Sequence, residues 1–382
     1  MAKSRKGNQV QKVLSILAYG EQGTWKSSVG VEALALKNPD GSPMKVLVID
    51  AEFGGVDTAL EEKSKKYGFN PENAYIVYTE SYTEVMDLLD KVKKNEPFYY
   101  YDEEGNEIIE DGEEVKDADG NVFHPDFILL DGTTVIYNAS SIALTKFSEK
   151  RAKVKAKAQK KTAEETLVAV QGAGLELKDF NKLNKERSQE LILKLIATGK
   201  HHYVTAREVD EKVSVKTDDG KFQSIPTGKK IPDGFKGMGY NVGTVLRLFI
   251  NDMGGVSAYV ENKDRTGTFE QNTVIDEPSL LMWQSVIDGN KGKEKVEMNP
   301  SSFRESIEKE YNKELEESNL SNENDEMSLE DYYSLIKDSL ASMPKDKKQT
   351  IANKIKTSGL PMKYETLTDI DKLKKYVEIV SE

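Results

Sequence analysis

The 382-residue sequence predicts an α/β protein with a mostly parallel sheet flanked by helices, plus a small helical C-terminal domain. Two observations lead to this fold class. Short apolar runs alternate with helical stretches over roughly the first 270 residues. A strongly acidic segment with few apolar residues then precedes a last helical stretch. We therefore expect a core at residues 1–300 with an acidic insertion at about 95–126, an acidic helix or linker at 301–327, and the helical domain at 328–382.

Five apolar runs are interpreted as the strands of the parallel sheet. They are residues 13–19, 45–50, 74–78, 127–131 and 202–206. Near-continuous apolar character over so few residues is typical of strands that are buried on both faces. Two later runs, residues 245–250 and 256–260, flank a glycine-containing turn and predict an antiparallel hairpin.

Helices are predicted between these strands and after the acidic segment. The stretches with helical character are residues 25–37, 82–94 and 180–198. In the last domain, Ser328 and Asp331 resemble a capping box that opens a helix through residue 340. Pro344 ends that pattern, and residues 367–380 predict a further helix.

Composition excludes several classes of protein. The absence of cysteine excludes disulfide scaffolds, zinc fingers, iron–sulfur clusters and thiol catalysis, and three histidines disfavour a multi-histidine metal site. No apolar stretch approaches the ~20 residues of a membrane span, and the first residues have no apolar signal core. We expect a soluble, cytoplasmic protein with no membrane partner. The net charge of −12 does not exclude nucleic acid, because binding depends on local patches.

The first strand runs directly into a phosphate-binding motif. Its residues follow GxxxxGK[ST], with Trp25 in place of the second glycine. Backbone amides of such a loop wrap phosphates, Lys26 would reach the β- and γ-phosphates, and the Ser27 hydroxyl would ligate Mg²⁺. The predicted cofactors are ATP and Mg²⁺. The predicted nucleotide-binding residues are Gly20, Glu21, Gln22, Gly23, Thr24, Trp25, Lys26, Ser27 and Ser28.

Two features of this motif leave alternatives open. The Cβ atom of Trp25 would crowd a bound phosphate unless the indole points away, which favours slow turnover. The motif is also compatible with a chance strand–turn–helix in which Lys26 is a solvated cap.

Two predicted strands end in carboxylates. Asp131 follows the apolar run of residues 127–130 and is predicted to hold the Mg²⁺ shell together with Ser27. The alternative is that Asp131 caps the helix that starts near Thr133. Asp50 ends the run of residues 45–50, and Glu52 follows two residues later, where a carboxylate beside the phosphate loop could orient water. A surface glutamate in a loop is the alternative there.

The order and spacing of these motifs resemble the RecA-like recombinase ATPases over residues 13–269, with residues 96–126 and the C-terminal domain outside the resemblance. The resemblance implies that Glu52 activates the attacking water and that Thr205 or Arg207, at the end of the next core strand, senses the γ-phosphate. Residues 260–267 resemble the Lys-x-Arg-x-Gly hairpin of this family. That implies that Lys263 and Arg265 act on the nucleotide of a neighbouring subunit, although a solvated hairpin tip is the alternative.

The resemblance is closest to phage-encoded ATPases that accompany single-strand annealing proteins. It implies an ATP-hydrolysing homo-oligomer, ring or filament, acting on single-stranded DNA in recombination, annealing or replication, in the host cytoplasm if phage-encoded. Two other functions stay open. One is a nucleotide-gated adaptor for a recombinase or single-strand-binding protein, which the C-terminal domain would contact. The other is a hexameric helicase, against which the short chain argues.

Two basic segments are candidates for contact with DNA. Residues 151–161 hold six cations and no acid, and they follow the Asp131 strand and its helix, where RecA-like proteins have a mobile DNA-binding loop. The residues proposed there are Arg151, Lys153, Lys155 and Lys157. The second segment, residues 221–240, is rich in glycine and lysine and offers Lys229 and Lys230. Its aromatic residues Phe222, Phe235 and Tyr240 would stack on bases. Ordinary solvated surface is the alternative for both segments.

Overall fold

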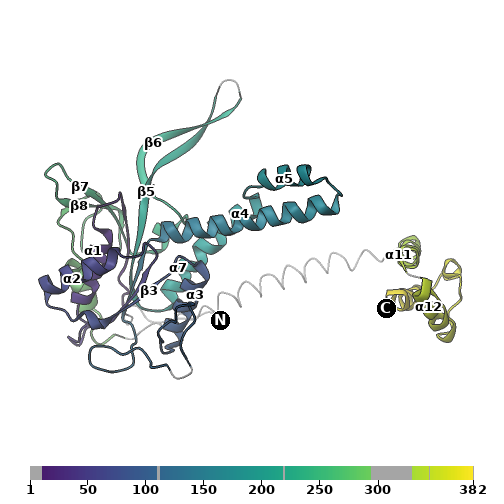
Figure 1. Ribbon diagram of the computed structural model, residues 1–382, viewed down its shortest axis with the longest axis horizontal. Coiled ribbons are helices and arrows are strands. Elements are labelled where there is room, and N and C mark those ends of the chain that lie inside the picture. The colour runs from purple at the N-terminus through teal and green to yellow at the C-terminus, as the bar shows by residue number, and fades with distance from the viewer. Residues whose placement is uncertain (1–10, 110–111, 218–219, 294–328, 344, 382) are drawn as a thin grey trace. The chain divides into compact units, whose positions relative to one another are not determined.

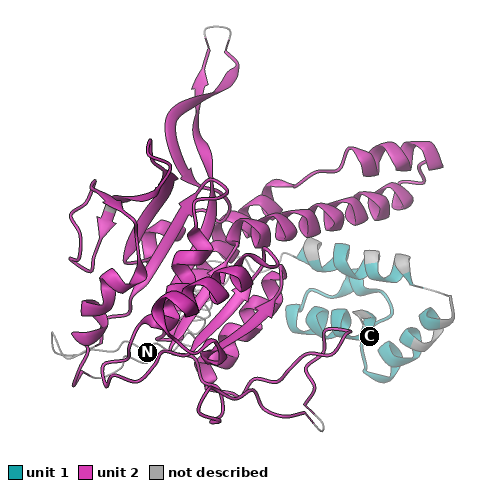
Figure 2. Cartoon of the chain, turned by 60° about the vertical axis from the view of Figure 1, so that its left-hand side comes forward, with its two compact units in different colours: residues 1, 301–382 teal, residues 2–300 magenta. Residues whose placement is uncertain are grey.

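A computed structural model of the chain describes residues 11–109, 112–217, 220–293, 329–343 and 345–381. The chain divides into two compact units, residues 2–300 and residues 301–382, the second grouped with Met1 (Figure 2). The predicted linker at 301–327 lies outside the described residues, and so do the predicted helix cap Ser328 and Pro344.

The first unit contains a mostly parallel sheet, which confirms the predicted fold class (Figure 1). Its strands in order are β3-β2-β4-β5-β1-β7-β8-β9, and β6 pairs with β5. The six strands from β3 to β7 are parallel, whereas β8, β9 and β6 pair antiparallel with their neighbours. The strands are β1 Ser15–Gly20, β2 Val46–Asp50, β3 Ala74–Tyr78, β4 Phe127–Asp131, β5 His201–Lys216, β6 Phe222–Pro232, β7 Thr244–Ile250, β8 Val256–Asp264 and β9 Val274–Asp276.

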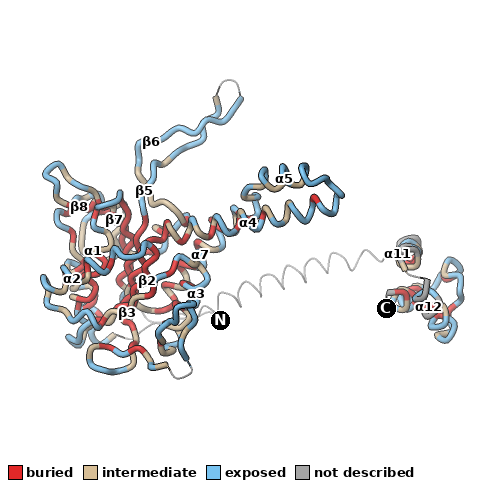
Figure 3. The backbone as a smooth tube through the Cα atoms, viewed as in Figure 1, coloured by how far each residue is buried: buried red, intermediate tan, exposed pale blue. Residues whose placement is uncertain are grey.

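Helices cover both faces of this sheet because its strands are apolar on both sides. In β1, Leu17 and Tyr19 belong to one core, and Ile16 and Ala18 belong to the other. The first core is closed by α3 Tyr82–Lys94, α4 Thr133–Ala158 and α7 Ser188–Ala197. The second is closed by α1 Lys26–Val31, η1 Glu32–Ala35, α2 Gly55–Tyr67, η4 Leu280–Trp283 and α9 Gln284–Asp288. Figure 3 shows the buried strands between these two layers.

Two parts of the first unit extend beyond the sheet (Figures 1 and 3). The outer half of β5 and its partner β6 form a two-stranded arm. Helix α4 continues past the core and packs against α5 Ala163–Gln171. From α5 the chain returns through α6 Leu177–Asn181 and η3 Lys182–Arg187 to α7.

These extensions correct two predictions. The run at residues 151–161 was expected in a mobile loop, but most of it is the last part of α4. Residues 221–240, the second basic segment, contain β6 and the short helix α8 Met238–Asn241. The predicted strand at 202–206 also continues to Lys216.

The segment between α3 and β4 folds beside β3. Isolated bridges join Tyr99 to Glu114, Tyr101 to Glu107, and Lys116 to Val122. Its turns are closed by two aspartates, Asp102 and Asp117, whose carboxylates accept hydrogen bonds from amides that follow them in the chain. We call this segment, residues 95–126, the insertion; residues 110 and 111 lie outside the description.

The second unit is a small helical bundle. Its elements are α11 Leu329–Ser342, α12 Lys345–Thr357, η5 Tyr364–Thr366 and α13 Ile370–Ser381. Ile336, Ile355, Leu373 and Tyr376 are buried in its own core, so the predicted C-terminal helices have a hydrophobic interior. Across the described parts of both units, no helix combines the length and the apolar character that a membrane span requires.

Candidate nucleotide site

The predicted phosphate loop leaves the carboxyl end of β1 and enters α1. A Cβ atom on Gly20 would lie 2.2 Å from the carbonyl oxygen of Leu248 in β7, so this position requires glycine. Thr24 is buried, and its hydroxyl donates to the carbonyl oxygen of Glu21 at 2.8 Å. These contacts fix the loop between two strands and leave its outer residues Gln22 and Gly23 exposed.

Lys26 is the first residue of α1, and its ammonium group points back into the loop. Its Nζ atom donates to the carbonyl oxygens of Gly20 at 3.2 Å and Glu21 at 2.7 Å. Burial lowers the pKa of Lys26, although the nearby carboxylates of Glu52 and Asp131 raise it. Lys26 is therefore a partly buried cation at the centre of the site rather than the solvated cap of the alternative interpretation.

Trp25 explains why the motif normally has glycine at this position. Its φ is +58°, in the left-handed region that glycine enters without steric cost. The side chain is 61 % exposed, so the indole is directed toward solvent. The departure from the motif therefore strains the backbone but does not bury an indole in the loop.

Asp131, at the end of β4, lies beside the phosphate loop. It is 1 % exposed, and its Oδ1 atom accepts a hydrogen bond from the Thr205 hydroxyl. Burial raises the pKa of Asp131 to about 6, although the nearby hydroxyls of Thr205 and Ser27 lower it. The N-cap of α4 is Gly132 and has no side-chain hydrogen bond, so Asp131 does not cap that helix.

The pair Asp131 and Ser27 fits a magnesium ion. The Oδ2 atom of Asp131 is buried and has no hydrogen-bond partner among the described residues. The described chain has no cluster of three or more His, Cys, Asp or Glu side chains suited to a metal. Mg²⁺ does not need one, because it is usually held by one or two carboxylates together with phosphate oxygens and water. Ser27, Asp131 and the loop before α1 therefore form a candidate site for a phosphate group and its magnesium ion.

Glu52 follows β2 and is positioned by Asp50. Both carboxylate oxygens of Asp50 accept backbone amides, from Glu52 at 2.8 Å, Phe53 at 3.1 Å and Gly54 at 3.0 Å. A Cβ atom on Gly132 would lie 2.7 Å from Cγ of Glu52, so the residue after Asp131 must be small. Asp50 is thus occupied with building the turn, and Glu52 is the carboxylate that is presented at the site.

Arg207 was one of two candidates for sensing the γ-phosphate, and it contacts Glu52. Its Nε atom donates to Oε1 of Glu52 at 3.0 Å. Thr205, the other candidate, is 1 % exposed, donates to Asp131 and accepts from the Gly132 amide. Its hydroxyl is thus occupied, and Arg207 is the candidate with a charged group available at the site.

A buried ion pair anchors the segment behind the loop. The carboxylate of Glu32 in η1 accepts from Lys63 of α2 at 2.6 Å and from the amide of Leu280 at 3.1 Å. It also accepts from the Ser279 hydroxyl at 2.5 Å. Sequence reasoning missed this network, since a glutamate within a helix gives no indication that it will be buried.

Lys263 and Arg265 lie near the amino end of β1, whereas the phosphate loop follows its carboxyl end. Asp264 pairs with Thr244, which pairs with Ile16 near the amino end of β1. Lys263 donates to the carbonyl oxygen of Gly239 at 2.6 Å, and its pKa is lowered to about 8 by burial and by Arg265. Arg265 is exposed and follows the end of β8. Neither residue reaches the phosphate loop of its own chain.

The basic residues of α4 do not all remain available. Arg151 pairs with Asp179, lies 3.6 Å from Glu176 and stacks on Phe147, so it fastens α6 to α4. The other three predicted residues are exposed on the helix: Lys153, Lys155 and Lys157.

The second basic segment, residues 221–240, also presents only part of what was predicted. Lys230 pairs with Asp210 at 3.1 Å, whereas Lys229 is exposed. Phe222 and Tyr240 are 74 % and 81 % exposed, as base stacking requires. Phe235 is buried against Tyr82 and Tyr137, so its predicted role in stacking on bases is wrong.

Comparison with known proteins adds little to this geometry. No protein-family model matches the sequence, and no curated protein matches it. Among solved structures, the chain is similar to a KaiC-like protein of the hyperthermophilic archaeon Pyrococcus horikoshii. The identity is 11 %, the TM-score is 0.35, and the match covers 69 % of this chain and 89 % of the other. A similarity of this size supports no conclusion about function.

Proposed function

We propose that the chain binds ATP with Mg²⁺, hydrolyses it to ADP and phosphate, and works as a homo-oligomer on single-stranded DNA. The supporting observation is the convergence of four side chains at the carboxyl edge of β1, β2 and β4. They are the ammonium of Lys26, the hydroxyl of Ser27 and the carboxylates of Asp131 and Glu52.

The residues would divide the reaction between them. Lys26 leaves the carbonyl oxygens of Gly20 and Glu21 and neutralises charge on the β- and γ-phosphates. Glu52 orients a water and accepts its proton as the water oxygen bonds to the γ-phosphorus and the bond to the bridging oxygen breaks. Ser27 and Asp131 would hold Mg²⁺, which neutralises phosphate charge when it is bound.

Action in trans is supported by where the basic pair lies. Arg265 is exposed near the amino end of β1, whereas the phosphate loop follows the carboxyl end of that strand. Any contact of Arg265 with a nucleotide in a phosphate loop would therefore involve another copy of the chain. An arginine supplied by a neighbour stabilises charge in the transition state. Each site would then be complete only at a subunit interface.

Binding of single-stranded DNA is supported by the exposed cations of α4. Lys153 and Lys157 are four residues apart and share a helix face, and no acid lies between residues 151 and 161. Lys229 and the exposed ring of Phe222 on the arm provide a second surface of the same chemistry.

A nucleotide-gated adaptor with little hydrolysis is the second candidate function. The left-handed Trp25 favours it, since strain in the phosphate loop reduces the precision with which the loop can hold a transition state. The C-terminal unit would contact the recombinase or single-strand-binding protein.

One experiment separates the two functions: the rate of ATP hydrolysis with and without single-stranded DNA. Strong stimulation supports the ATPase, and tight nucleotide binding without turnover supports the adaptor.

Substituting Lys153, Lys155 and Lys157 with alanine should flatten the salt dependence of DNA binding by about 0.7 per lost phosphate contact. The matched control is the triple alanine variant of Lys65, Lys66 and Lys94, which are exposed elsewhere. Equal DNA binding by both triple variants would contradict the role of α4.

A further inference from the structure

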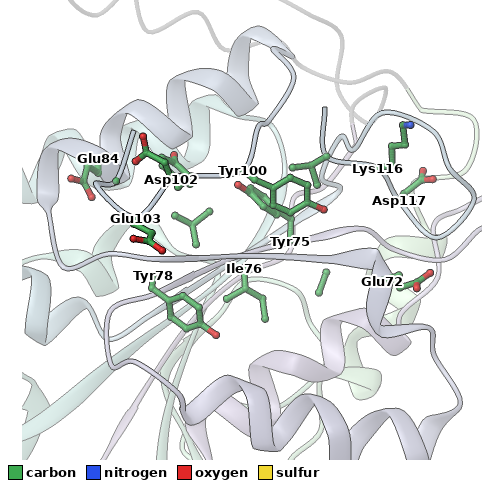
Figure 4. Close-up of a pocket in the computed structure, with 15 residues that line it drawn as sticks. Glu72, Tyr75, Ile76, Tyr78, Glu84, Tyr100, Asp102, Glu103, Lys116 and Asp117 are labelled. Carbon is green, nitrogen blue, oxygen red and sulfur yellow. The ribbon is translucent and has the colours of Figure 1, made fainter. Parts of the chain in front are cut away.

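A groove of about 710 Å³ lies between strand β3 and the insertion (Figure 4). All five residues of β3 line it, from Ala74 to Tyr78. The opposite wall comes from two parts of the insertion, residues 100–105 and 115–117. The insertion lies outside the part of the sequence that resembles RecA-like ATPases, and the proposed function makes no use of it.

β3 is the outermost strand on this side of the described sheet. It pairs only with β2 in the strand order, in parallel register from Val46 and Ala74 to Asp50 and Tyr78. An edge strand presents backbone amides and carbonyls that can pair with another extended chain. Five residues of strand span about 17 Å, which sets the length of segment that the edge can hold.

The wall that faces β3 is held in place by the hydrophobic core. The Tyr75 hydroxyl donates to the carbonyl oxygen of Tyr99 at 2.7 Å. Phe98 and Phe123 are buried and pack their rings against Tyr75. The groove is therefore formed by packed elements on both sides, which leaves the space along the strand open.

The lining of the groove is acidic and aromatic. Five of its lining residues are carboxylates, against one lysine. In Figure 4, Glu84, Asp102 and Glu103 gather near the Tyr78 end of the strand, and Glu72 and Asp117 lie near the other end. Tyr100, on the wall of the insertion, is 55 % exposed, and its ring face can receive a cation. One of the five carboxylates, Asp117, is paired with Lys45. The other four carboxylates take no part in this ion pair.

We propose that this groove binds an extended segment of another protein that alternates lysine or arginine with apolar residues. The segment adds to β3 as a further strand. Its cationic side chains meet the carboxylates and Tyr100 of the insertion, and its apolar side chains contact Ile76 and Tyr78 on the other face. The described lysine-rich runs at the end of α4 and in α12 are helical, and those in β5 and β6 already pair with each other in the arm, so none of them is a free extended strand. That favours a partner over a second copy.

The proposed site is separate from the nucleotide site. Strands β2, β4 and β5 lie between β3 and β1, from which the phosphate loop extends. The Lys26→Ala variant should therefore bind the segment as the unmodified chain does. If the peptide does not bind, the proposed ATPase activity is not contradicted. If the chain does not hydrolyse ATP, the proposed peptide-binding groove is not contradicted.

The test uses the full-length chain and a fluorescent octapeptide of alternating lysine and valine. We expect binding that weakens with salt, because the contacts are electrostatic. An octapeptide of alternating lysine and proline has the same charge but cannot pair as a strand, so it should bind at least about tenfold more weakly. Spermine controls for attraction by charge alone. Equal binding of the proline peptide, or equal competition by spermine, would overturn strand addition.

Variants locate the binding on the protein. Glu72 and Glu103 are exposed, so their replacement by glutamine is compatible with folding, and Glu72→Gln with Glu103→Gln should weaken peptide binding about three- to tenfold. The control is Glu62→Gln with Glu164→Gln, which removes two exposed carboxylates outside the groove. Equal affinity of both double variants would overturn the site. Sedimentation in which the peptide dissociates oligomers of the chain would show that a second copy occupies the groove and that the partner assignment is wrong.

Discussion

The guanidinium of Arg207 holds the carboxylate of Glu52 through a hydrogen-bonded ion pair of 3.0 Å between Nε and Oε1. Asp50 fixes the backbone of Glu52 from the other side, through the amide at 2.8 Å. The glutamate proposed to activate water is thus oriented by Asp50, two residues before it, and by Arg207, 155 residues after it. Arg207 belongs to β5, so the orientation of Glu52 depends on the strand that continues into the arm.

Replacing Glu52 with glutamine should separate nucleotide binding from chemistry. The variant should bind ATP as the unmodified chain does, because the phosphate loop is intact, but turnover should fall by about 10²–10⁴ without a base. Phosphate release and equilibrium binding measure the two effects. Glu62→Gln, on the exposed face of α2, is the control and should leave both values unchanged. Undiminished turnover in Glu52→Gln would make Glu52 structural.

Replacing Lys26 with alanine should weaken ATP binding. A charge-assisted hydrogen bond contributes ~1.5–3 kcal/mol, which corresponds to a loss of roughly 10- to 150-fold in affinity for one such bond. Titration with ATP measures the change, and Lys66→Ala, at an exposed position of α2, is the control. If affinity and turnover stay the same, the loop is not a phosphate site.

Replacing Trp25 with glycine should stabilise the first unit by about 1 kcal/mol, because a non-glycine residue in the left-handed region costs roughly 1–2 kcal/mol. Trp283 is then the remaining tryptophan of the chain, and its buried ring reports urea unfolding of the first unit by fluorescence. Trp25→Ala keeps the strain and removes the indole, so it should not be stabilised. ATP binding should persist in both variants. Its complete loss would show that the indole holds nucleotide.

Acid should destabilise the first unit through His202. Burial lowers the pKa of His202 from 6.5 to about 4. Between these pH values the His202 imidazole binds a proton in the unfolded chain but not in the folded chain. The free energy of unfolding therefore falls by up to about 3 kcal/mol as the pH drops. Above pH 6.5 this contribution is fully retained. His202→Leu should remove this part of the pH dependence, and His124→Leu should leave it. Equal pH profiles for the two variants would contradict the assignment.

Mixing two inactive variants should restore activity if Arg265 acts in trans. An interface that pairs an intact Glu52 with a neighbour's intact Arg265 forms when Arg265→Ala chains are combined with Glu52→Gln chains. The rate per subunit should also rise with protein concentration. A rate that is independent of concentration, in chains that sediment as monomers with ATP and DNA present, would rule out assembly as the source of activity.

The sequence predicts the parallel strands and the phosphate loop because both depend on local patterns. An apolar run followed by Gly20 and Lys26, or ending in Asp131, gives enough information in a few residues. The sequence does not predict the arm, because the valines in the outer half of β5 lie among charged residues and remain exposed. Val213, for example, is 45 % exposed. Without a buried face, such a strand resembles a loop.

The contact between Arg207 and Glu52 could not be predicted, because 155 positions separate them and only the fold of the sheet brings them together. The left-handed backbone of Trp25 and the burial of Phe235 are also consequences of tertiary structure. A sequence pattern identifies a residue's chemical type, whereas its partner depends on which strands lie side by side.

The place of β5 in the sheet has a consequence for synthesis of the chain. β5 lies between β1 and β4, and the other neighbour of β1 is β7. During translation β1 therefore has no strand to pair with until residue 201 has been added, although it is the first strand made. Until that residue is made, the nascent chain contains apolar strands with unpaired edges, a state that is prone to aggregation. We therefore expect the chain to be most prone to aggregation before the central strand β5 is made.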